Sequence, residues 1–85
     1  MSHIRRENNV SDFNEGDRVT YVPAHLIDEF AHRGYQTDGI QRGVVKSKND
    51  FYIFVRYVSH GELQAAAQAT NPKDLINDEL SNAKL

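Results

Sequence analysis

The chain has 85 residues, a formal net charge of −2 and no cysteine. Such a chain forms at most one domain with a thin core, and disulfide bonds and cysteine-based zinc sites are excluded. The slightly acidic balance argues against a dedicated non-specific nucleic-acid binder, which is usually basic.

The N-terminal residues 1–7 are polar and lack the apolar core of a signal peptide. No apolar run approaches the roughly 20 residues that a membrane-spanning helix needs. We therefore expect a cytoplasmic protein with no membrane partner.

Residues 1–11 show no hydrophobic period and are predicted to form a flexible arm. Residues 18–22 follow a turn-forming Gly16-Asp17 pair and alternate in polarity, which predicts a first strand. Pro23 closes this strand because it has no backbone N–H for a sheet ladder.

A helical stripe of Leu26, Ile27 and Phe30 then predicts a helix of one to three turns over residues 24–33, followed by Gly34 at the C′ position. An irregular loop with the same three anchors is the alternative. The helix lies within an insertion, residues 24–41, between the first two strands. Asp38-Gly39 is a further turn pair.

The next predicted elements are a strand over 41–46, a hairpin loop over 47–50, a strand over 51–58 and a turn over 59–61. Residues 63–69 have high helix propensity, but the sheet needs another strand, so we expect one near 66–70. Asn71 and Pro72 predict a one-turn helix, with Leu75 in the core. Residues 12–76 form the predicted domain and 77–85 a flexible tail.

This order of elements resembles an SH3-like barrel of the Tudor/KOW type. The resemblance covers roughly residues 13–76 and also extends to small uncharacterised proteins of phages and prophages. It implies a mainly β fold: a small barrel of four to five strands with a short helical insertion after the first strand and a one-turn helix near the C-terminus. The segments that carry it are 16–19, 43–45, 55–57 and 71–75. SH3-like barrels bind proteins or nucleic acids, so the resemblance does not select the partner.

The third predicted strand offers the first candidate site. Its inward set is expected to be Phe51, Ile53, Val55 and Tyr57, which leaves an outward set of two aromatic residues and an arginine suited to stacking or protein binding: Tyr52, Phe54 and Arg56. Coverage of Phe54 by the 24–33 helix is the favoured alternative, and the two faces could also be exchanged.

A second candidate is a basic edge that would contact phosphates, formed by Arg42, Lys46, Lys48 and Arg56. Ordinary solubilising charge is the alternative. A third is a weak metal site, because His25, Glu29 and His32 lie near one face of the predicted helix. Their spacing is not that of an established zinc motif, so we expect neither a metal nor another cofactor.

No catalytic motif is present, and we do not expect an enzyme. The sequence favours a non-catalytic, phage-type module that binds and modulates a host or phage protein complex. Nucleic-acid binding and metal or small-ligand binding are the alternatives, and self-association stays open.

Overall fold

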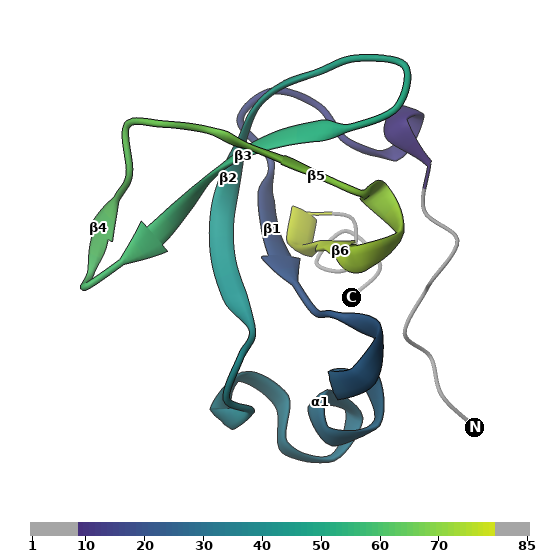
Figure 1. The fold of residues 1–85 in the computed structure, drawn as a ribbon, viewed down its shortest axis with the longest axis vertical. Coiled ribbons are helices and arrows are strands. Elements are labelled where there is room, and N and C mark those ends of the chain that lie inside the picture. Colours follow the sequence, from purple (N-terminus) through teal and green to yellow (C-terminus); the bar gives the residue numbers. More distant parts are fainter. Residues whose placement is uncertain (1–8, 80–85) are drawn as a thin grey trace.

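The computed structural model describes residues 9–79, which form a mainly β domain (Figure 1). Its six-stranded antiparallel sheet has the strand order β4-β3-β2-β1-β6, and β5 pairs with β3 beside β4. No helix in residues 9–79 combines the length and the apolar character needed to cross a membrane. Residues 1–8 and 80–85, parts of the predicted arm and tail, lie outside the described residues.

Strand β1 (Arg18–Tyr21) and the helix after it confirm the predictions for this region. The 3-10 helix η2 (Ala24–Leu26) continues into α1 (Ile27–Arg33), which ends at Gly34 with a φ of 60°. A second 3-10 helix, η3 (Gly34–Gln36), leads back to the sheet. Figure 1 shows α1 beyond the end of β1, away from the loop that joins β2 and β3.

Strands β2 (Gln41–Lys48) and β3 (Ile53–Ser59) form the longest ladder of the sheet. The register shifts between Val45 and Ser47, so Lys46 is the extra residue of a β-bulge. The prediction of a loop over 47–50 is therefore wrong by two residues, because Ser47 and Lys48 still pair with β3. The observed loop is 49–52.

The conformation of this loop shows that the prediction of Phe51 as an inward residue is wrong. The Asn49 side chain accepts hydrogen bonds from the backbone N–H groups of Phe51 (2.8 Å) and Tyr52 (2.7 Å), which holds both residues outside the strand. Phe51 is consequently 74% exposed and not part of the core. The other three predicted inward residues, Ile53, Val55 and Tyr57, are buried as expected.

The sheet is not closed into a barrel, and this part of the prediction is wrong. Strand β4 (Glu62–Leu63) and β5 (Gln68–Thr70) both pair with β3, whereas β6 (Leu75–Asn77) pairs with β1. The 3-10 helix η4 (Pro72–Asp74) turns the chain between β5 and β6. The Asn71 side chain caps it by accepting from the N–H of Lys73 (2.9 Å), as predicted.

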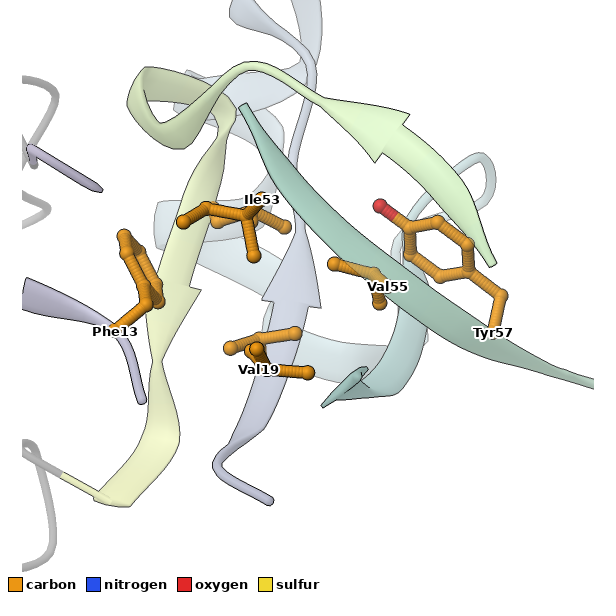
Figure 2. Close-up of a cluster of buried hydrophobic side chains, with 7 residues drawn as sticks. Phe13, Val19, Ile53, Val55 and Tyr57 are labelled. Atoms are coloured by element: carbon orange, nitrogen blue, oxygen red, sulfur yellow. The ribbon is translucent and has the colours of Figure 1, made fainter. Parts of the chain in front are cut away.

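The core lies on the concave face of the curved sheet (Figure 2). Phe13, before β1, packs with side chains from four strands: Val19, Val45, Ile53, Val55, Tyr57 and Leu75. Leu75 is fully buried, as the sequence predicts. Val10 packs partly against this cluster from the 3-10 helix η1 (Val10–Asp12), so the end of the predicted arm contributes to the domain.

Asn77 connects the last strand to the turn before the first. Its Nδ2 donates to the carbonyl oxygen of Asp12 (2.8 Å) and to the carboxylate of Asp17 (2.9 Å). Its Oδ1 accepts from the backbone N–H of Glu79 (2.9 Å). Asn77 is buried, so these bonds satisfy polar atoms that would otherwise be costly to remove from water.

Gly43 of β2 lies so close to β3 that there is no room for a side chain. A Cβ atom at this position would lie 2.6 Å from the carbonyl oxygen of Arg56 and 2.7 Å from Cγ1 of Val55. We expect Gly43→Ala to destabilise the domain by roughly 1–3 kcal/mol, because neither the backbone nor the buried valine can move freely. Urea unfolding followed by circular dichroism measures this loss.

Gly61→Asn is the matched control. Gly61 has a φ of 78° and open space around it, and asparagine tolerates this left-handed conformation better than other residues. We expect Gly61→Asn to lower the free energy of unfolding less than Gly43→Ala does. Equal stability of Gly43→Ala and the unaltered protein would contradict the close approach.

Candidate functional site

The face of the sheet that points away from the core carries the main candidate site. Residues on β2 and β3 alternate between the two faces, so the buried Val45, Val55 and Tyr57 place their neighbours outward. Lys46 and Ser47 both lie opposite Phe54 at the bulge, which directs both toward this face. We define the outer β2–β3 surface by the outward residues Val44, Lys46, Phe54, Arg56, Val58 and Leu63.

Two aliphatic side chains form the exposed apolar part of this surface. Val58 and Leu63 are directly paired partners in β3 and β4. They are 42% and 39% exposed, which makes them two of the most exposed large apolar residues in the described chain. Figure 1 shows the β3–β4 hairpin extending away from the rest of the domain, so a partner can reach both side chains.

The hairpin is held by a tight turn and by one arginine. His60 and Gly61 both have positive φ values, 54° and 78°, as the two central residues of a type I′ hairpin turn require. Nε of Arg56 donates to the carbonyl oxygen of Gln64 (2.8 Å), and the N–H of Gln64 donates to the carbonyl oxygen of Tyr57 (2.9 Å). These bonds fix the chain after β4 against β3. The acceptor is a neutral carbonyl, so this hydrogen bond brings no negative charge to Arg56.

Positive charge is concentrated on this part of the outer face. The outward positions of β2, β3 and β4 all lie within residues 9–79, and none of them carries an acidic side chain. Arg42, which pairs with Thr20 of β1, is also exposed.

The neighbouring β1–β6 part of the outer face is electrically different. Arg18 donates to the Glu79 carboxylate (2.6 Å), and this hydrogen bond lowers the pKa of Glu79 below its usual value. The buried Thr20 hydroxyl donates to the Asp78 carboxylate (3.0 Å). Over β1 the cation Arg18 is thus accompanied by two carboxylates, and the area whose outward positions carry no acidic side chain ends at β2.

The structure separates the residues of the predicted aromatic–basic site. Phe54 and Arg56 lie together on the outer β2–β3 surface, and both are half-buried. The start of β3 is remote from α1 in Figure 1, so the expectation that the helix covers Phe54 is wrong. Tyr52 belongs to the 49–52 loop, where it is 46% exposed beside Phe51.

The predicted basic edge is also divided. Arg42, Lys46 and Arg56 share the outer face, but Nζ of Lys48 donates to the carbonyl oxygens of Phe13 (2.7 Å) and Val10 (3.4 Å). Lys48 pairs with the inward residue Ile53 because the bulge changes the alternation of β2. It therefore anchors the N-terminal segment.

The three possible metal ligands are not gathered into a site. Glu29 on α1 pairs with Arg33 (3.0 Å), one helical turn away. Among residues 9–79, no group of three histidine, aspartate or glutamate side chains is placed to hold a metal ion, so His25, Glu29 and His32 do not form a centre.

The structure has a cleft on the opposite side of the sheet that the sequence does not predict. It has a volume of about 310 Å³ and lies between β5, η4 and the paired ends of β1 and β2. The rings of Tyr21 and Tyr57 meet edge to face at 6.2 Å along its wall. The other lining residues are Gln41, Gln68, Ala69, Thr70, Asn71 and Asp74. Alternation predicts Tyr57 as an inward residue, but no sequence signal places it beside Tyr21 and η4.

Comparisons with protein-family models, curated proteins and solved structures found no match to this chain.

Tyr57 gives the cleft a measurable property. Its hydroxyl is hydrogen-bonded to Thr70 Oγ1 (2.8 Å), and burial raises the pKa of the phenol above its usual value. We expect Tyr57→Phe to lower the free energy of unfolding by about 1 kcal/mol at neutral pH, because one hydrogen bond is lost.

The same pair predicts a dependence on pH. Folding favours the neutral phenol, so its contribution is complete below the pKa of the unfolded chain, near 10, and is lost as the pH rises through the higher folded-state pKa. The stability difference between the unaltered protein and Tyr57→Phe should therefore shrink above about pH 10. Denaturant unfolding at several pH values measures it, and a constant difference across that range would contradict the assignment.

Proposed function

We propose that this protein is a non-catalytic binding module that captures a partner protein through the outer β2–β3 surface. The observation that carries the proposal is the exposed pair Val58 and Leu63, which lies on the same face as Phe54 and Arg56. Aromatic and arginine residues are enriched at the energetic centres of protein interfaces. Apolar side chains on a projecting hairpin gain free energy when a partner removes them from water.

The order of strands and the one-turn helix before β6 support an SH3-like arrangement with an open sheet. A domain of this kind suits the role inferred from its sequence, in which a phage-type protein occupies a surface of a host or phage complex and so modulates it. The absence of an identifiable catalytic constellation in the sequence supports a function by binding alone.

The proposal is tested by quantitative capture from native cells with the unaltered protein, Val58→Ser and Leu63→Ser. Both side chains are partly exposed, so folding should be preserved within about 0.5 kcal/mol. We expect each substitution to reduce recovery of the specific partner about tenfold, as loss of an interface centre does. Recovery is measured by mass spectrometry after nuclease treatment.

Phe51→Ser is the matched control, since it removes an even more exposed apolar side chain from a different surface. We expect the control to capture the partner normally. Loss of capture with Phe51→Ser and normal capture with the two hairpin variants would move the site to the 49–52 loop and contradict the proposal.

Nucleic-acid binding is the second candidate, supported by the cations Arg42, Lys46 and Arg56 on a face with Phe54. Phosphate contacts would give an affinity that falls steeply with salt. This candidate does not account for the exposure of Val58 and Leu63. It predicts that labelled single- or double-stranded oligonucleotides raise fluorescence anisotropy at low salt, and that Lys46→Glu weakens this binding. No binding at low salt would exclude it.

A further inference from the structure

The outer β2–β3 surface has a charge pattern that specifies its partner more closely. Resting on the function proposed above, we infer that it binds an acidic amphipathic helix of the partner protein, with carboxylates placed beside apolar side chains. Three properties of this surface support it: the sign of its charges, their position relative to the apolar side chains, and its dimensions.

The sign follows from the side chains at the outward positions. Lys46 is exposed at the bulge, and the Nε hydrogen bond of Arg56 goes to a neutral backbone carbonyl. No carboxylate at the outward positions of β2, β3 and β4 offsets these cations, and those positions all lie in the described part of the chain. Complementary charge across an interface favours a partner with carboxylates and disfavours a basic one.

The position of the charges relative to the apolar groups makes the partner amphipathic. Arg56 lies between Phe54 and Val58 along the outward side of β3, and Leu63 stands opposite Val58 on β4. Lys46 lies at the bulge, across from Phe54. Carboxylates of the partner must therefore alternate closely with apolar groups. A purely acidic chain would leave Val58 and Leu63 in water, and a purely apolar chain would leave the cations without counter-charges.

The size of the face matches a helix. Three neighbouring strands span about 10 Å, close to the diameter of an α-helix with its side chains. Phe54 and Val58 are four residues apart on one strand, which corresponds to roughly 13 Å. A helix covers this length in about nine residues, so two to three turns are sufficient.

The paired charges over β1 limit the site on one side. The Asp78 and Glu79 carboxylates are held there by Thr20 and Arg18. Arg18 is already paired with Glu79 there, so a helix with its own carboxylates gains less over β1 than beside Lys46 and Arg56. The division of the outer face therefore sets where an acidic partner can bind.

The test uses two synthetic 14-residue peptides of helical design. In the first, glutamate and leucine follow the spacing of an amphipathic helix, and in the second every glutamate is replaced by lysine. Binding to the full chain is measured by fluorescence anisotropy of the labelled peptides, and the contact surface by NMR amide shifts. We expect the acidic peptide to bind, to shift residues of the outer β2–β3 surface, and to bind more weakly at 1 M salt, where charges are screened beyond about 3 Å. The lysine peptide should not bind.

Lys46→Glu is the decisive variant, because Lys46 is exposed and its replacement leaves the Arg56 contact with Gln64 in place. We expect it to weaken binding of the acidic peptide about fivefold, the effect of one exposed ion pair. Lys73→Glu is the matched control: it changes the net charge equally on the exposed side of η4 and should leave the affinity nearly unchanged.

Three results would overturn the inference. Equal binding of both peptides would show an apolar contact without charge selection, and equal effects of Lys46→Glu and Lys73→Glu would show only a response to net charge. Binding of oligonucleotides but not of the acidic peptide would assign the cations to phosphate. If Val58→Ser and Leu63→Ser still reduce recovery of the native partner about tenfold in any of these cases, protein binding stands and only the acidic helix is wrong.

Discussion

The fold depends on how a thin sheet joins its first and last strands, and the Asn77 side chain makes that connection. Its amide reaches the Asp12 carbonyl and the Asp17 carboxylate on one side, and its oxygen holds the N–H of Glu79 on the other. The backbone ladder pairs β6 with β1, and this one buried side chain ties the end of β6 to the segment that carries Phe13. A domain with so few buried residues has little other apolar surface to hold these segments together.

The same connection shapes the outer face. Because β6 ends at Asn77, the next residues bring the Asp78 and Glu79 carboxylates to Thr20 and Arg18. As a result, one half of the face carries an ion pair and a further carboxylate, whereas the outward positions of the other half carry cations only. The arrangement of charge, not its total, therefore defines the candidate binding surface.

The sequence predicts elements well where local chemistry determines them. Alternation places Val19 inside, and Gly34 and Asn71 mark the helix end and the helix start at the observed positions. The errors arise where one residue changes the register. The bulge at Lys46 extends β2, shifts the loop and turns Lys48 inward, and a polarity pattern of period two contains no sign of such an insertion. Phe51 falls in the shifted loop, where its backbone N–H donates to Asn49, and it is therefore not a core residue.

The sequence predicts only part of the candidate site. Phe54 and Arg56 are outward, as alternation predicts, but Val58 and Leu63 join them because a hairpin pairs β3 with β4. Leu63 lies in a segment with high helix propensity, and only pairing with β3 makes it a strand residue. Similarly, the tyrosine cleft forms from four separate segments, and their assembly is a property of the whole fold.

The segment between β1 and β2 leaves and rejoins the sheet at a single residue pair. Tyr21 and Gln41 are direct partners in the ladder, so the two ends of the connecting segment that contains α1 lie next to each other. Lengthening such a loop adds little to the entropy of closure. This segment is consequently suited to the insertion of another domain. Such an insertion would leave the strand register unchanged and would lie away from the opposite end of the sheet.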